Sequence, residues 1–373
     1  MKIPFHKYIS EFEEHSNVSD VLDGEDINQI ELLEKEFCSY IDVSYAVATT
    51  SGTSALHLAM LALDLKRGDK IVCSVNTHPA VPEVVRHFDA EPVFIDIDGT
   101  NYHLDAQKLD DYLAKNINKK LKAVIVTIMG GANVDLEKIY KIASFYDVKV
   151  VVDASEALGS SYKGDKIGSV YSDITCFDFS PHLKKNICSG GMLTTNDEDI
   201  LKRARLLANH GIEQDSKTLR YIYNVVDIGN DYVMDMLSAG YFRAYIKRID
   251  KNIQRQQEIA KIYNKELEGV AHVELSKIDD ENFSYHLYMI KIDKNRDSFA
   301  LDMKNKGVDT GLHYIPLHLL GYYKSKYELK VNDYPKALKY YQQILSLPIY
   351  PSMSDEEVMY VCNVIKKVAK TKV

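Results

Sequence analysis

Short apolar runs alternate with amphipathic segments through the first 200 residues of the chain. The apolar runs predict strands at 45–49, 70–73, 92–96, 123–127 and 149–153. The amphipathic segments predict helices at 28–41, 55–63, about 80–88 and 136–146. Because short strands that alternate with helices form βαβ units, we predict an α/β protein with a mostly parallel sheet covered on both faces.

This alternation weakens after about residue 200. Helical periodicity then covers about 235–268 and ends near Gly269, and residues 285–292 predict a strand. We therefore expect a large domain at 1–235, which includes the N-terminal segment. A long linking helix and a smaller C-terminal α+β domain are expected at 236–373.

Composition narrows the possible partners. The 373 residues carry 46 Lys and Arg against 54 Asp and Glu, and this net charge of −8 argues against a nucleic-acid partner. No apolar run approaches the ~18–20 residues of a membrane span, and the N-terminus lacks the apolar segment of a signal peptide. The five cysteines are scattered and form no CxxC pair, so they predict neither a disulfide framework nor a zinc site. We expect a cytoplasmic protein with no membrane partner and no metal.

Candidate chemistry lies directly after the predicted strands, where ligands bind in open α/β sheets. Ser51-Gly52-Thr53-Ser54 stands between a strand and a helix, so its N–H groups and hydroxyls suit a phosphate, although an ordinary helix cap has the same pattern. Asp153-Ala154-Ser155-Glu156 ends another strand. Its first acid can hold a cationic ring nitrogen or simply cap a helix.

Two more places carry reactive side chains. Lys184 and Lys185 precede Gly190-Gly191 in a loop between apolar strands. A partly desolvated lysine there is a nucleophile for a carbonyl, whereas a solvated basic turn has the same sequence. His78 follows a strand and can stack, relay protons or be an ordinary loop residue, and no second His or Cys at ligand spacing supports a metal.

Together these segments resemble the DegT/DnrJ/EryC1/StrS family of pyridoxal-phosphate-dependent sugar aminotransferases, within the fold type I aminotransferases. The resemblance covers essentially the whole chain, through segments 51–59, 90–96, 152–159, 209–211, 311–318 and 345–351. It implies a large cofactor-binding domain with a mostly parallel sheet of the seven-stranded type and a smaller C-terminal α+β domain. The implied cofactor is pyridoxal 5'-phosphate (PLP).

The resemblance also assigns roles to residues. Gly52 and Thr53 would hold the cofactor phosphate. Asp153 would pair with the protonated ring nitrogen. His78 stands where the family has an aromatic ring that stacks on the pyridine, and Glu156 stands where a Gln or Glu lies against it.

The position of the reactive lysine depends on the alignment register. The family typically has Ser-Phe-x-x-x-Lys-Asn, and Ser180 and Lys185 keep this spacing, so they are the expected phosphate contact and Schiff-base lysine. Lys184 is the second choice. A gapless register instead puts Leu183 at the lysine position and Asp178 at the serine position, which places an acid beside a phosphate. The Glu of the family's Gly-Glu-Gly-Gly stretch is absent.

Further implied roles lie later in the chain. The family's Gly-x-Asn-Tyr-Arg-Met stretch contributes an Asn to the partner subunit's phosphate, so a homodimer is expected. Here a gapless match puts Asp231 at that position, Asn230 serves after a one-residue shift, and Val233 replaces the Arg. His313 and Tyr314 are the expected substrate contacts.

The implied reaction transfers an amino group from an amino acid, by analogy L-glutamate, to a nucleotide-linked keto-sugar, for surface polysaccharide or deoxyamino-sugar biosynthesis. Two alternatives stay open. One is a sugar 3-dehydratase that uses the aminated cofactor; such members carry His in place of the lysine, but His182 matches that position in neither register. The other is a catalytically lapsed paralogue that binds a nucleotide-sugar.

Overall fold

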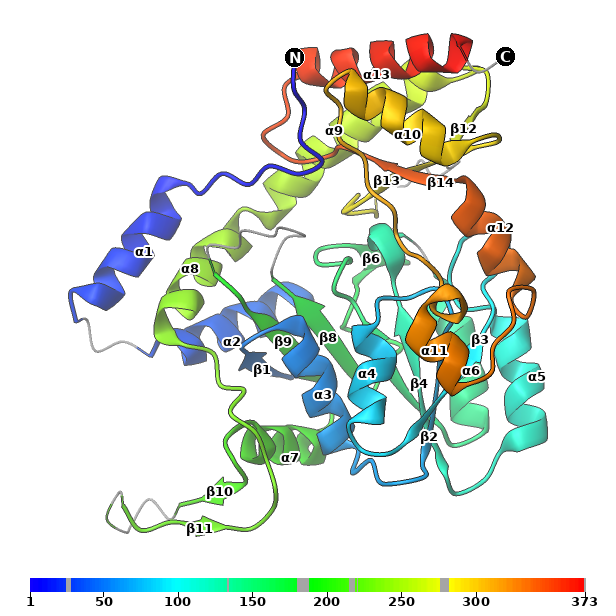
Figure 1. Cartoon of the computed structure of the whole chain (residues 1–373). Coiled ribbons are helices and arrows are strands. Elements are labelled where there is room, and N and C mark those ends of the chain that lie inside the picture. The colour runs from blue at the N-terminus through cyan, green and yellow to red at the C-terminus, as the bar shows by residue number, and fades with distance from the viewer. Residues whose placement is uncertain are drawn as a thin grey trace.

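A seven-stranded sheet forms the centre of the N-terminal part of the chain (Figure 1). The computed structural model describes residues 1–24, 28–132, 134–179, 188–214, 219, 221–275 and 282–371. The sheet has the order β1-β9-β8-β5-β4-β2-β3. Its strands are β1 (Tyr45–Thr49), β2 (Lys70–Ser74), β3 (Glu91–Ile95), β4 (Leu121–Thr127), β5 (Lys149–Asp153), β8 (Ile174–Asp178) and β9 (Gly191–Thr195). Only β9 runs antiparallel to its neighbours, so the predicted mostly parallel sheet is confirmed.

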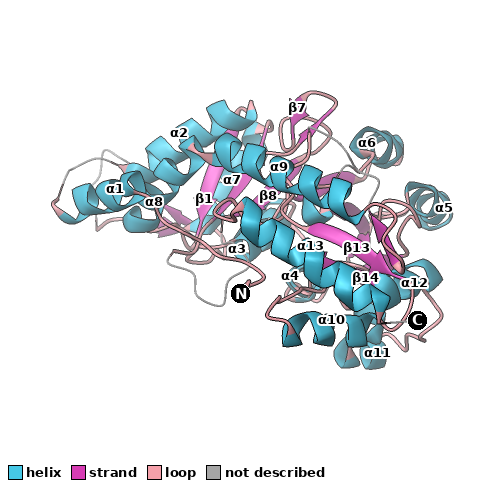
Figure 2. Ribbon diagram, turned by 90° about the horizontal axis from the view of Figure 1, so that it is seen from above, coloured by secondary structure: helices cyan, strands magenta, loops and turns pink. Residues whose placement is uncertain are grey.

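Helices cover both faces of this sheet (Figure 2). One face packs against α3 (Gly52–Ala62), α4 (Ala80–Arg86) and α7 (Glu198–Ala208). The other packs against α2 (Gln29–Ile41), α5 (Ala106–Asn116), α6 (Leu136–Phe145) and α8 (Met236–Lys247). Strand residues such as Val124 and Val151 are fully buried, as expected for parallel strands covered on both sides.

The C-terminal part is built on a three-stranded antiparallel sheet of β12 (Val273–Leu275), β13 (Tyr288–Ile292) and β14 (Ile344–Leu347). Its core is shared with α9 (Ile249–Leu267), α10 (Arg296–Asn305) and α13 (Asp355–Lys370). Ile3 is fully buried in the same core and pairs with Val308, so both chain ends lie at this part of the molecule (Figure 1). The remaining helices are α1 (Phe12–Leu22), α11 (Gly321–Lys326) and α12 (Pro335–Gln343), with short 3-10 turns at Met129–Gly131 and Leu317–Leu319.

The single long helix predicted at 235–268 is wrong in one respect, because α8 and α9 are separate helices that meet at Arg248. The guanidinium of Arg248 donates to the hydroxyl of Tyr8 at 2.8 Å and to the carboxylate of Glu14 at 2.7 Å. The N-terminal segment is thereby fastened to the break between the two helices. The proposed domain boundary at 235/236 falls at Asp235, the N-cap of α8.

Asp96, directly after β3, caps a helix that lies 240 residues later in the chain. Its carboxylate accepts hydrogen bonds from the backbone N–H groups of Lys336 at 3.2 Å and Ala337 at 3.0 Å, in the first turn of α12. It also pairs with Lys108 at 3.1 Å. This contact ties the carboxyl edge of the large sheet to the C-terminal part.

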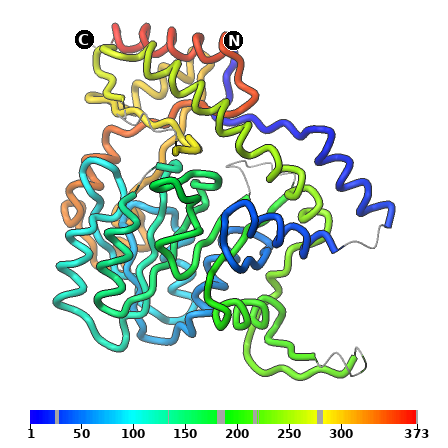
Figure 3. Tube along the Cα trace, turned by 180° about the vertical axis from the view of Figure 1, so that it is seen from behind, coloured from blue at the N-terminus to red at the C-terminus, as the bar shows by residue number. Residues whose placement is uncertain are grey.

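A thin arm projects from the body of the molecule (Figure 3). It contains the two short strands β10 (Ile212–Glu213) and β11 (Asn224–Val225). A second small hairpin is formed by β6 (Ser161–Tyr162) and β7 (Asp165–Lys166). No helix in the described part of the chain is long and apolar enough to span a bilayer.

Candidate active site

Asp153 is the last residue of β5 and lies at the carboxyl edge of the central sheet, where ligands bind in open α/β sheets. Its side chain is only 3% exposed. It accepts hydrogen bonds from the Thr127 hydroxyl at 3.2 Å, the Ser155 hydroxyl at 2.6 Å and the Ser155 N–H at 3.2 Å. Burial raises the pKa of Asp153, and the hydrogen bonds from Ser155 and Thr127 oppose that rise. Such a carboxylate is most stable with a cation beside it, and the protonated nitrogen of a pyridine ring meets that need.

The N-terminus of α3 lies at the same edge of the sheet. Ser51 caps the helix, since its hydroxyl accepts from the Ser54 N–H at 3.1 Å. The hydroxyls of Thr50 and Ser51 lie 2.8 Å and 2.9 Å from that of Ser54. Gly52 and Thr53 occupy the first turn, whose N–H groups have no partner within a helix. These donors suit the phosphate of a cofactor.

Gly191 allows β9 to pass directly against this cap. A Cβ atom at Gly191 would lie 2.5 Å from the carbonyl oxygen of Ser51 and 2.6 Å from the nitrogen of Gly52. Any side chain at Gly191 would therefore displace the first turn of α3. Gly191 is thus explained by the close approach of two backbones, whereas a Cβ atom at Gly190 would meet the side chains of Phe242 at 2.6 Å and Met234 at 2.7 Å.

Asp178, the last residue of β8, pairs with Gly191 across the sheet. A Cβ atom added to Gly52 would lie 2.6 Å from the Cβ of Asp178 and 2.9 Å from its Oδ2. The structure thus brings Asp178 to the first turn of α3, as the gapless register expects for this one position. Ser180 and Lys185, together with the alternative Lys184 and the gapless Leu183, lie outside the described residues.

Glu156 links the two parts of the molecule. One of its carboxylate oxygens accepts from the Gly130 N–H at 2.7 Å, and the other accepts from the hydroxyl of Tyr314. Burial and the charge of Glu156 raise the pKa of Tyr314 well above its usual value, so its hydroxyl stays protonated and donates. His78 is exposed, and its ring meets that of Tyr314 edge to face with centroids 5.6 Å apart. Glu156, Tyr314 and His78 are therefore brought together as one group.

Other predicted site residues make different contacts. His313 is 7% exposed and its Nδ1 lies 2.9 Å from the hydroxyl of Ser346, while its ring stacks on Phe5. The N–H of Asn230 donates to the carbonyl of Leu207, and its carbonyl accepts from the N–H of His210. A role of Asn230 at a partner's phosphate stays a prediction.

Sequence reasoning missed two threonines. Thr127 donates to Asp153 and its hydroxyl lies 2.7 Å from that of Thr77, which follows β2. Thr127 ends β4, the strand next to the one that ends in Asp153, and Thr77 follows β2, the next strand beyond β4. Because Thr127 ends the predicted strand 123–127, the same strand-end rule that selected Asp153 could have found it.

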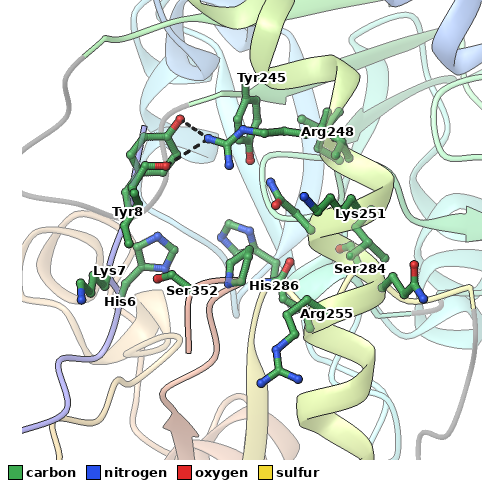
Figure 4. A pocket seen from close by; sticks show the side chains of 18 of the residues that line it. His6, Lys7, Tyr8, Tyr245, Arg248, Lys251, Arg255, Ser284, His286 and Ser352 are labelled. Carbon is green, nitrogen blue, oxygen red and sulfur yellow. Dashed lines mark hydrogen bonds between the residues drawn. The ribbon is translucent and has the colours of Figure 1, made fainter. Parts of the chain in front are cut away.

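A cavity of about 560 Å³ adjoins this site (Figure 4). Ser155 and Asp178 line it from the sheet side, and the N-terminal segment and α9 form other walls. Its lining includes the basic side chains Lys7, Arg248, Lys251 and Arg255. Arg248 and Arg255 are paired with acids, whereas Lys7 and Lys251 are exposed. No group of three or more His, Cys, Asp or Glu able to hold a metal occurs in the described ranges.

The chain is similar to known proteins in sequence and in fold. The sequence profile of the DegT/DnrJ/EryC1/StrS aminotransferase family matches residues 9–366. The spore coat polysaccharide biosynthesis protein SpsC of Bacillus subtilis is 32% identical, with 92% of this chain and 90% of SpsC covered. GDP-perosamine synthase of Escherichia coli O157:H7 is 28% identical, with 91% and 90% covered. The PMP form of the putative sugar aminotransferase Spr1654 from Streptococcus pneumoniae superposes with a TM-score of 0.90 at 25% identity, covering 100% of this chain and 98% of that one.

Proposed function

Because the chain belongs to the DegT/DnrJ/EryC1/StrS aminotransferase family, whose members are PLP-dependent, we propose that it aminates a keto-sugar carried on a nucleotide. The proposed amino donor is an amino acid, L-glutamate by analogy, and the proposed pathway builds a surface polysaccharide or a deoxyamino sugar. The observation that carries the proposal is the buried Asp153 carboxylate, held by hydroxyl donors at the same edge of the sheet as the first turn of α3. This arrangement fits the two ends of PLP, a cationic ring nitrogen and a phosphate.

Bound PLP supplies an electron sink for the electrons of the donor's Cα–H bond. The chain supplies the rest. Asp153 keeps the proton on the ring nitrogen, and Thr127 and Ser155 keep Asp153 oriented. We propose that Nζ of Lys185 takes the proton from the donor's Cα and later returns one to the acceptor carbon. Glu156 holds the Tyr314 hydroxyl at the edge of the site, where it can contact the acceptor sugar.

The adjoining cavity supports an anionic acceptor. Lys7 and Lys251 line this cavity and are exposed. Their positive charges would attract the diphosphate of a nucleotide. A volume of about 560 Å³ is typical of small-ligand pockets.

We also propose a homodimer, as the resemblance implies. The arm around β10 and β11 supports it, because six apolar or aromatic side chains there are 45–85% exposed: Tyr221, Ile222, Tyr223, Val225, Val226 and Ile228. Exposed apolar side chains gathered in one short segment are typical of an interaction site.

A spectroscopic half-reaction tests the proposed function. The protein is loaded with PLP and treated with L-glutamate, which is expected to replace the visible absorbance of the lysine-bound cofactor with that of the aminated cofactor. A panel of nucleotide-linked keto-sugars then identifies the acceptor by mass spectrometry of the aminated product. If no amino acid changes the absorbance spectrum of the PLP-loaded protein, the result would instead support the hypothesis of a catalytically lapsed paralogue.

Borohydride trapping identifies the lysine. We expect the reduced cofactor on the peptide at Lys185, and loss of the label in Lys185→Ala. Lys184→Ala is the matched control and is expected to keep the label. A label that follows Lys184 would reject the five-residue spacing from Ser180.

A further inference from the structure

Asp178 places a carboxylate at the first turn of α3. Its Oδ2 would lie 2.9 Å from a Cβ atom on Gly52, so the acid packs on the helix backbone itself. The position is fixed by the sheet, because Asp178 is paired with Gly191, and Gly191 in turn packs on Ser51. Asp178 is half-buried and lines the cavity, so it faces the space that a ligand enters.

The first turn of a helix attracts negative charge because its N–H groups and the helix dipole point outward. A side-chain carboxylate beside that turn is attracted by the same positive end of the helix as a phosphate. Asp178 also adds to the negative charge of the site, since its charge contributes with those of Glu156 and Asp153 to the raised pKa of Tyr314. A doubly charged phosphate placed beside Asp178 would meet repulsion at a few ångströms in a partly dry site.

We propose that the carboxylate of Asp178 competes with the cofactor phosphate for the first turn of α3, and so lowers the affinity of this chain for PLP relative to unphosphorylated pyridoxal. The inference rests on the proposed function in one respect, that the bound cofactor is PLP. It makes Asp178 a determinant of cofactor affinity that acts on the phosphate alone. In the cofactor-free protein the same carboxylate stabilises α3.

Ligand titration of two variants separates these effects. Asp178→Asn keeps the shape and removes the charge, and Asp178→Ser also restores a hydroxyl. The cofactor-free wild type and both variants are titrated with PLP and, separately, with pyridoxal, following absorbance and intrinsic tyrosine fluorescence. Asp165→Asn is the matched control, since Asp165 lies exposed in β7, away from α3.

We expect both Asp178 variants to bind PLP at least about tenfold more tightly than the wild type, with pyridoxal binding unchanged. Without cofactor, their melting temperatures are expected to fall by a few degrees, because α3 loses its anion. The control is expected to change neither affinity nor melting temperature.

Three results would overturn the inference: unchanged PLP affinity in both variants, an equal gain for PLP and pyridoxal, or variants that fold by circular dichroism yet bind no PLP. A failure of the proposed function has a different signature. In that case PLP binds, and the phosphate-specific gain is present, but L-glutamate leaves the spectrum unchanged.

Discussion

Three carboxylates surround the site, and each has a different partner. Asp153 is held by hydroxyls, Glu156 by an N–H and a phenol, and Asp178 lies on the first turn of a helix. Asp153 is costly to the cofactor-free protein, because its buried carboxylate accepts from two hydroxyls and one N–H, all of them neutral donors.

Asp153→Asn is therefore expected to stabilise the cofactor-free protein at neutral pH by about 1 kcal/mol while reducing transamination about 100-fold or more. Burial raises the pKa of Asp153 in the folded state above its unfolded value of 3.8. The folded state then binds the proton more tightly, so the wild type loses stability as the pH rises from 3.8 through the raised folded pKa.

Chemical denaturation of both proteins without cofactor, from pH 3.5 to 8, measures this effect. The difference in the free energy of unfolding should vanish at the acidic end and reach its full size at neutral pH. A constant difference across the whole range would show that the charge of Asp153 is not its cause.

At this scale the sequence was informative for residues that end strands and uninformative for contacts across the chain. Asp153 and the Gly52 turn were predicted from their position after a strand. The hydrogen bond between Tyr314 and Glu156 joins residues 158 apart, so local patterns carry no signal for it. The approach of Asp178 to Gly52 likewise depends on the pairing of β8 with β9 and the packing of α3.

Among the elements, the apolar runs were the most dependable signal. The strands at 45–49 and 149–153 have the predicted bounds. The predicted helix at 235–268 failed at Arg248, where binding to Tyr8 and Glu14 fixes a break that helical periodicity does not reveal. Tertiary contacts override local preference at such points.

The cap of α12 gives a prediction for an element. Asp96→Ala is expected to lower the free energy of unfolding by about 2–3 kcal/mol, since it removes the acceptor of Lys336 N–H and the buried Ala337 N–H and the partner of Lys108. Urea denaturation measures the loss.

Asp333→Ala is the matched control, because Asp333 is exposed next to the same helix and accepts a local hydrogen bond from the Lys330 N–H. Its expected cost is about 0.5 kcal/mol or less. If both variants lost the same free energy of unfolding, the proposed capping role of Asp96 would be wrong.

At the scale of the whole molecule, the apolar arm gives the clearest prediction. Val225, the last residue of β11, is 57% exposed, and Ile228, three residues later, is 85% exposed. The arm that contains β11 leaves the body of the molecule (Figure 3). We expect the double variant Val225→Lys, Ile228→Lys to shift the protein from dimer to monomer, because lysines there would be buried without partners in an interface. Light scattering coupled to size exclusion measures the mass.

Phe145→Lys serves as the control, since Phe145 is 81% exposed at the end of α6, far along the chain from the arm. It is expected to leave the mass unchanged. A wild type that is monomeric at micromolar concentration would refute the dimer directly.

Ile3 lies fully buried in a core made by α9, α10 and α13. Ile3 is therefore synthesised long before the helices that bury it. Ile3 can be buried only after α9, α10 and α13 have been synthesised, because those helices form its surroundings. Deleting the segment that carries Ile3 would therefore expose apolar side chains of α9, α10 and α13, which lie more than 240 residues later in the sequence.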